Sequence, residues 1–132
     1  MPLEGDAKLR IQGKLDLIDL VVIGFGAKTF ADLGGRSGVE GGYSLYAASR
    51  HSMNGALVDV NASDLSRARV GRQEGLRFVQ GNFTSQVVAQ EVGGVDAVFL
   101  FDMLLHQPSP DWHEVLTHYA EKAHLLVTSR LR

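Results

Sequence analysis

The sequence has no cysteine among its 132 residues, and only three prolines and one tryptophan. Without cysteine, disulfide frameworks, thiolate catalysis and cysteine-type zinc sites are excluded. Acidic and basic residues nearly balance, with a formal net charge of −2 and no basic run. The sequence therefore has no positively charged segment that would attract nucleic acid. Apolar runs such as Leu20 to Ile23 are far too short to cross a bilayer, and no secretory signal pattern opens the sequence. We therefore expect a cytoplasmic protein without nucleic-acid or membrane partners.

Glycine, in contrast, is abundant, with 15 residues in a chain that is 45% hydrophobic. One stretch stands out, because the β-prone residues 29–33 run directly into Gly34-Gly35-Arg36-Ser37-Gly38, and a helical pattern begins at Tyr43. A strand, a glycine loop and a helix together form a pocket for a nucleotide-like ligand, since glycines allow close backbone approach and free amides face the ligand. The loop by itself is equally consistent with a connection that binds nothing.

An acidic residue further along the chain favours the ligand-binding interpretation. Residues 56–60 have a strand pattern with Asp59 near its carboxyl end, about 20 residues after Gly38. A helical stretch lies between the two, so the segment predicts a βαβ unit with a right-handed crossover. A carboxylate at that position can accept two hydrogen bonds from a ribose diol. We interpret Asp59 in this way rather than as an exposed carboxylate at a strand end.

A second glycine pair, Gly24 and Gly26, imitates the start of a dinucleotide-binding fingerprint. That fingerprint requires a third glycine and an acidic residue about 20 positions later. Position 29 is threonine, and residues 42–55 contain neither aspartate nor glutamate. The NAD interpretation is therefore disfavoured, and a turn joining two elements explains the pair better.

The remaining chain alternates strand and helix patterns. We expect a loosely held tail over 1–13 and a lead-in helix over 14–23, which together form an N-terminal segment of residues 1–28. The β-branched run Val21-Val22-Ile23 would also suit a strand, and periodicity alone does not decide between the two. Helices are expected at 43–51, 64–73, 85–92 and from Pro110 onward, and strands at 29–33, 56–60, 76–80, 95–101 and 123–128. This alternation predicts an α/β fold with an open parallel sheet.

From Thr29 to Thr128 the sequence resembles the class I S-adenosylmethionine (SAM) dependent methyltransferases. The resemblance rests on the loop from Asp32 to Gly38, on Asp59, on Gly81-Asn82-Phe83 after the third strand and on Phe101-Asp102 after the fourth. It implies that residues 29–132 form a SAM-binding domain, a three-layer Rossmann-like open sheet of five mostly parallel strands in the order 3-2-1-4-5 with helices on both faces. The family sheet normally has seven strands, so the domain is expected to lack the last ones.

The resemblance also implies which residues bind the cofactor. Loop residues face the methionine part of SAM, the acid after the second strand holds the ribose, and residues after the third strand flank the adenine. Arg36 replaces the usual middle glycine, and it either pairs with the methionine carboxylate or faces solvent. The implied cofactor-binding residues are Asp32, Gly34, Gly35, Arg36, Gly38, Asp59, Asn82, Phe83 and Phe101.

Methyl transfer requires mainly alignment, and a general base helps when the acceptor is a hydroxyl. His106 and Asp102 are the candidate bases, since their segment would lie over the methyl group. A structural histidine that hydrogen-bonds the loop backbone is the favoured alternative for His106. The four histidines after residue 105 lack the i, i+4 spacing of helical metal ligands, so no metal site is expected.

We therefore expect a SAM-dependent methyltransferase that acts on an unidentified small molecule. The main alternative is a non-catalytic SAM- or nucleotide-binding module, or a subunit that needs a partner for catalysis. The apolar segment Leu125-Leu126-Val127 would form an exposed edge of the sheet, and such edges tend to recruit another strand. A homodimer or a partner subunit bound through this fifth-strand edge is the expected assembly.

Overall fold

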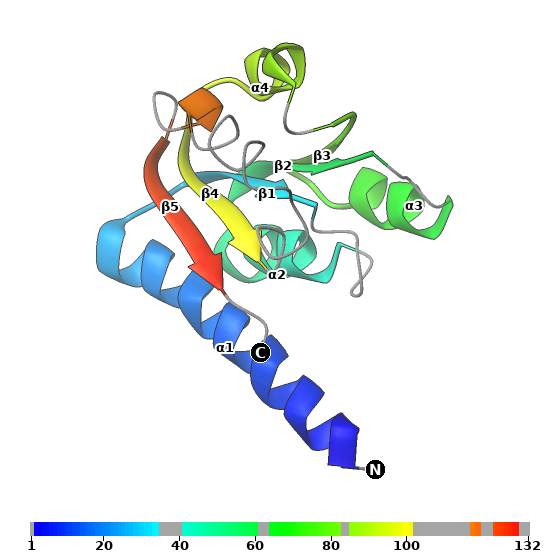
Figure 1. Ribbon diagram of the computed structural model, residues 1–132, viewed down its shortest axis with the longest axis vertical. Helices are drawn as coiled ribbons and strands as arrows, with labels where there is room; N and C mark the ends of the chain where they lie inside the picture. The colour runs from blue at the N-terminus through cyan, green and yellow to red at the C-terminus, as the bar shows by residue number, and fades with distance from the viewer. Residues whose placement is uncertain are drawn as a thin grey trace.

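The structure is a computed structural model, and it describes residues 2–34, 41–60, 64–82, 85–101, 117–119 and 123–129. For residues 2–10, 64–66, 124–126 and 128–129 it describes the backbone alone. Helices and strands alternate along most of the chain (Figure 1). The elements are α1 (Pro2–Phe25), β1 (Thr29–Leu33), α2 (Gly42–His51), β2 (Asn54–Asp59), α3 (Asp64–Arg72), β3 (Leu76–Gln80), α4 (Gln86–Val92), β4 (Val95–Phe101) and β5 (Ala123–Ser129).

The strands form one sheet in the order β3-β2-β1-β4-β5, and every neighbouring pair is parallel. The expected α/β fold with a Rossmann-like parallel sheet is thus confirmed. β1 lies at the centre, between β2 and β4. Because parallel strands end at the same edge, the segments that follow β1, β2, β3 and β4 all leave from one edge of the sheet, called here the carboxyl edge.

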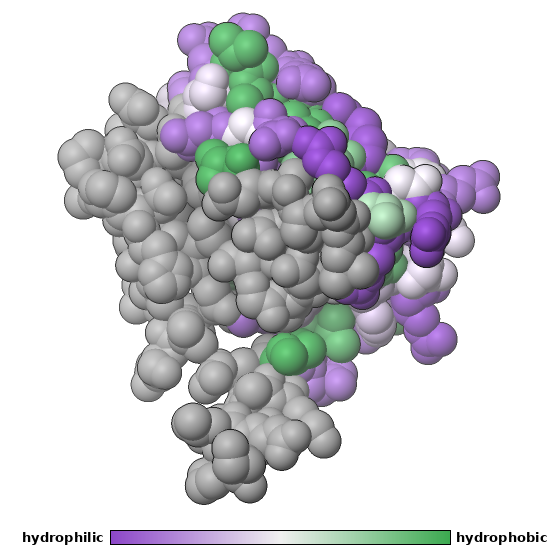
Figure 2. All heavy atoms as spheres, turned by 90° about the vertical axis from the view of Figure 1, so that its right-hand side faces the viewer, coloured by the Kyte–Doolittle hydropathy of each residue, from purple (hydrophilic) through white to green (hydrophobic). Residues whose placement is uncertain are grey.

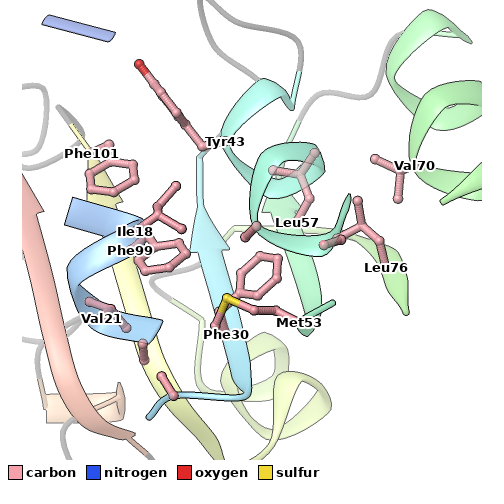
Figure 3. Packing of buried hydrophobic residues seen from close by; sticks show 14 residues of the cluster. Ile18, Val21, Phe30, Tyr43, Met53, Leu57, Val70, Leu76, Phe99 and Phe101 are labelled. Carbon is pink, nitrogen blue, oxygen red and sulfur yellow. The ribbon is translucent and has the colours of Figure 1, made fainter. Parts of the chain in front are cut away.

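Two hydrophobic clusters cover the two faces of the sheet, because side chains alternate along each strand. Phe30 and Phe99, both fully buried, stack at 5.4 Å and belong to the cluster beneath α1, α2 and α3 (Figure 3). Their neighbours Ala31 and Val98 point to the opposite face, where they pack with α4 and Tyr119. The fold therefore has three layers, with the sheet in the middle.

Helix α1 corrects the expectation of a loose tail over residues 1–13, because the helix begins at Pro2. Proline suits a first helical position, where its missing N–H is not needed. Ile18 and Val21 are buried against the sheet, whereas the N-terminal part of α1 extends beyond it in Figure 1. Since Gly5 and Gly13 interrupt a mixed pattern, periodicity alone did not reveal this helix.

A polar cluster attaches α1 to the end of α2. The Tyr46 hydroxyl donates a hydrogen bond to Asp19 Oδ1 at 2.8 Å, and His51 Nε2 lies 2.6 Å from the same oxygen. The hydrogen bond with His51 is the largest factor that lowers the pKa of the Asp19 carboxyl below its usual value. We call Asp19, Tyr46 and His51 the α1 clamp.

The Gly24-Phe25-Gly26 segment occupies the junction between α1 and β1. Gly24 lies in the last turn of α1, and Gly26 adopts a φ of 70° in the connection, a conformation that favours glycine. The pair therefore follows a helix and precedes a strand, which is the reverse of the order in a dinucleotide fingerprint. The interpretation as a turn agrees with this position.

The helix expected from Pro110 lies mostly outside the described residues, although residues 117–119 are helical and Tyr119 is buried in the core. Hydrophilic residues form most of the coloured surface in Figure 2, and hydrophobic ones reach it in small groups, one at the level of α4. Among the described helices, none is long and apolar enough to cross a membrane.

Candidate functional site

Three strands bring predicted site residues to one face at the carboxyl edge. Asp32, Asp59 and Phe101 each lie two residues after a side chain of the cluster beneath α1 and α2, namely Phe30, Leu57 and Phe99. Since side chains two apart along a strand share a face, all three point toward the same side of the sheet. The sheet order places them on the neighbouring strands β1, β2 and β4.

Asp32 is fully buried near the end of β1, and only one of its oxygens has a partner among the described residues. The Ser44 hydroxyl on α2 donates a hydrogen bond to Oδ2 at 2.7 Å, whereas Oδ1 is buried without a hydrogen bond. Burial raises the pKa of the Asp32 carboxyl to about 7, with a smaller contribution from the charge of Asp59. A buried, unsatisfied acceptor oxygen is unusual and marks a position where a ligand donor would be stabilised.

Gly34 turns the chain directly after β1. Its φ is 73°, and its buried N–H donates a hydrogen bond to the Val58 carbonyl at 2.6 Å, which ties the end of β1 to β2. A side chain at this φ would be strained, so the turn explains why the sequence has glycine here. The other predicted loop residues, Gly35, Arg36 and Gly38, lie outside the described residues.

Asp59 ends β2 with only 7% of its surface exposed. Its backbone carbonyl accepts a hydrogen bond from the Gly81 N–H at 2.9 Å, so the segment after β3 begins beside it. Asn82, the predicted adenine-facing residue, is exposed just beyond that contact, and Phe83 lies outside the described residues. The residues predicted to face ribose and adenine thus lie at the end of β2 and just after its neighbour β3.

Phe101 ends β4 in an aromatic group that the sequence did not predict. Its ring meets the Tyr43 ring edge-on at 5.1 Å and stacks on Phe99 at 5.2 Å (Figure 3). Lys14 of α1 places its Nζ 5.6 Å from the centre of the Tyr43 ring, and only 5% of Lys14 is exposed. Phe101 is thus buried beneath Tyr43.

Three residues near the predicted site, Lys14, Tyr43 and Ser44, were not predicted from the sequence. Ser44 was detectable in principle, because it lies in the first turn of the helix that follows the glycine loop. Lys14 carried no such signal, since it is far from the loop in sequence. The predicted bases His106 and Asp102 lie outside the described residues. The described part of the chain contains no group of three side chains that could hold a metal ion.

A separate hollow of about 350 Å³ lies away from these residues, at the opposite, amino edge of the sheet. It is lined by strand beginnings such as Thr29, Asn54 and Leu76 and by the end of α4. The Arg77 guanidinium in its wall donates to the carbonyls of Glu91 and Val92. None of the predicted site residues lines this hollow, so we do not assign the cofactor site to it.

Comparison with known proteins finds no matching family model and no matching curated protein. Solved structures do match. The methyltransferase domain of a bacterial Hen1 has a TM-score of 0.72 at 19% identity, covering 90% of this chain and 65% of that one. A methyltransferase described as putative, from Thermobifida fusca, has a TM-score of 0.74 at 14% identity, covering 90% and 50%. The chain thus spans less than two thirds of each of these proteins.

A short-chain dehydrogenase/reductase from Veillonella parvula also matches, with a TM-score of 0.60 at 13% identity over 77% of this chain and 46% of that one. The Rossmann-like core is therefore shared more widely, and at these identities the likeness concerns the fold alone. The better overlap is with the methyltransferases, whose motif pattern the sequence also resembles. The chain has the class I SAM-dependent methyltransferase fold.

Proposed function

We propose that this chain binds SAM at the carboxyl edge of its sheet and transfers the methyl group to a small-molecule acceptor. The observation that carries the proposal is the convergence of Asp32, Gly34 and Asp59 at the ends of β1 and β2. Open α/β sheets bind their ligands at this edge. The dinucleotide alternative lacks this support, because Gly24 and Gly26 lie at the opposite edge.

The residues present fit the parts of SAM. Asp59 can accept hydrogen bonds from the ribose hydroxyls, and Asn82 lies just beyond it on the side of β3, where the adenine would extend. The unsatisfied Asp32 Oδ1 can accept a hydrogen bond from the ammonium of the methionine part. Gly34 keeps the space over β1 free of side-chain atoms.

Bound SAM supplies a methyl group that its sulfonium has already activated, so the protein contributes mainly binding and orientation. Asp59 would fix the ribose, and Asp32 would favour the cationic end of the ligand. An ionised Asp32 is stabilised by a nearby positive charge, which offsets the cost of its burial. Asp102 and His106 remain the two candidates for the general base that accepts a proton from a hydroxyl acceptor.

Calorimetry with SAM, S-adenosylhomocysteine, NAD and ATP tests the proposal. We expect the two SAM-type ligands to bind and NAD and ATP to bind far more weakly. Asp59→Ala should weaken the binding of SAM and of S-adenosylhomocysteine by about 1.5–3 kcal/mol, the usual loss for hydrogen bonds to a charged group. Asp16→Ala, which changes an exposed carboxylate on α1, is the matched control and should bind normally.

Two results would contradict this assignment. Preferential binding of NAD would favour the dinucleotide alternative, and equal SAM affinity of Asp59→Ala and wild type would remove the ribose role of Asp59. A methyl-transfer assay with radiolabelled SAM and a panel of small hydroxyl and amine acceptors then identifies the acceptor class.

A further inference from the structure

Lys14 is the one cation buried in the described core. Lysine side chains are rarely so buried, and here the ammonium lies over the face of Tyr43, an arrangement in which the ring stabilises positive charge. Tyr43 in turn contacts Phe101, the last residue of β4. The ammonium of α1 thus lies against a ring of α2, and that ring packs on the end of β4.

The position of Lys14 along α1 brings it to the carboxyl edge. α1 leads into the amino end of β1, so it runs antiparallel to the strands, as Figure 1 shows. Lys14 lies 11 residues before Phe25, about 17 Å back along the helix, and the five residues of β1 span about 16 Å. Figure 3 shows Tyr43, the ring that the ammonium of Lys14 faces, beyond the carboxyl end of β1.

The order of the strands then indicates which part of the ligand would lie near the Lys14 ammonium. With adenine beside Asn82 after β3 and ribose at Asp59 on β2, the amino-acid end must continue in the same direction, across β1 and toward β4. Asp32 lies on β1, and Phe101, Tyr43 and Lys14 follow on the side of β4. Neighbouring strands are about 4.8 Å apart, so β2 and β4 are separated by about 10 Å, within the reach of such a ligand.

We propose that Lys14 binds the carboxylate of the ligand's amino-acid end, while Asp32 Oδ1 accepts a hydrogen bond from its ammonium. This inference rests on the proposed function, because it assumes a SAM-type ligand with its ribose at Asp59. A zwitterionic end group matches a site with one buried cation and one buried acid. α1 is then part of the binding site rather than a segment that precedes it.

The α1 clamp gives the proposal a second, remote consequence. Asp19 lies five residues after Lys14 on α1, and its carboxylate is held by Tyr46 and His51 of α2. Since the clamp fixes α1 against α2, it also fixes the position of the Lys14 ammonium over Tyr43. Loss of the clamp should therefore weaken recognition of the carboxylate although no clamp residue touches the ligand.

The test compares two ligands that differ only in the carboxylate: S-adenosylhomocysteine and its decarboxylated analogue, which keeps the ammonium. Their affinities are measured by calorimetry for wild type, Lys14→Met, Lys14→Arg and the control Lys28→Met, an exposed lysine at the amino edge. Lys14→Met should bind S-adenosylhomocysteine about 10- to 100-fold more weakly and the analogue unchanged. Lys14→Arg should recover part of the loss, and Lys28→Met should match wild type.

Asp19→Ala should show the same selective loss in a milder form. Circular dichroism and thermal unfolding confirm that each variant is folded, and Lys14→Gln replaces Lys14→Met if the latter is not. Equal weakening of both ligands, or of neither, would overturn the role of Lys14. If wild-type protein binds neither ligand, the proposed function itself fails, which is a different and distinguishable result.

Discussion

The Ser44 hydroxyl on α2 donates a hydrogen bond of 2.7 Å to the buried carboxyl of Asp32 at the end of β1. This contact joins the first helix after the glycine loop to the central strand. It also leaves Asp32 Oδ1 without a partner among the described residues. The protein thus buries an incompletely hydrogen-bonded carboxyl group, which is energetically unfavourable, next to the start of the loop. Such groups are more typical of binding sites than of structural cores.

Asp32→Asn should stabilise the protein, and increasingly so as the pH rises. The folded state keeps Asp32 protonated up to about pH 7, whereas the unfolded chain ionises this carboxyl near its ordinary pKa of 3.8. The folded state therefore binds more protons over this interval, so the free energy of unfolding of the wild type decreases from about pH 4 to about pH 7 and then levels off.

The variant lacks this decrease. Its advantage in free energy of unfolding should grow between these pH values to at most about 4 kcal/mol, since each pKa unit is worth about 1.36 kcal/mol. Urea unfolding at several pH values measures it, and Asp16→Asn, an exposed carboxylate, should show no such growth. An advantage that does not vary with pH would mean that Asp32 is ionised in the folded protein.

Gly34→Val should abolish cofactor binding, and Gly26→Val is its matched control. Both glycines have φ near 70°, so either valine introduces backbone strain, at least about 1 kcal/mol of lost stability. Only Gly34 lies at the carboxyl edge. Thermal unfolding should show a loss of stability in both variants, and calorimetry should show normal SAM binding for Gly26→Val alone. Normal binding by Gly34→Val would show that the loop merely connects β1 to α2.

Gly55→Ala should destabilise the fold by about 1–3 kcal/mol through overpacking. Gly55 pairs with Phe30 across β1 and β2, and a Cβ at Gly55 would overlap the Phe30 ring. That ring is fully buried and stacked on Phe99, so it has no room to move. Gly13→Ala, inside α1 with no atom near its added Cβ, should instead stabilise by about 0.5–1 kcal/mol. Urea unfolding of the two variants should therefore shift in opposite directions.

We propose that the outer edge of β5 recruits another chain, either a second copy or a partner subunit. β5 pairs with β4 on one side, and no described strand lies on its other side. Unpaired backbone groups at a sheet edge are satisfied by pairing with another strand. Light scattering over a range of concentrations should show a dimer that dissociates on dilution. A monomer at every concentration would exclude the second copy as the occupant of this edge, and leaves a partner subunit or cover from within the chain.

Local sequence patterns identified the strands closely because their signals are short-range. β1 was predicted at its observed bounds, and Asp59 was expected near the end of β2, where it lies. Strand patterns depend on β-branched and apolar residues within a few positions, and glycine at a turn reflects its own φ. The βαβ alternation of these elements was enough to predict a parallel sheet.

The sequence by itself thus determined the sheet, its carboxyl edge and the acids at the ends of β1 and β2. Tertiary structure alone decided that α1 carries Lys14 to Tyr43, because the C-terminal half of this helix is stabilised by packing of Ile18 and Val21 rather than by a regular apolar pattern. It also decided that Ser44 meets one oxygen of Asp32 and leaves the other free of partners among the described residues. Such contacts depend on how helices dock on the sheet, and docking is set by the whole core rather than by neighbours in sequence.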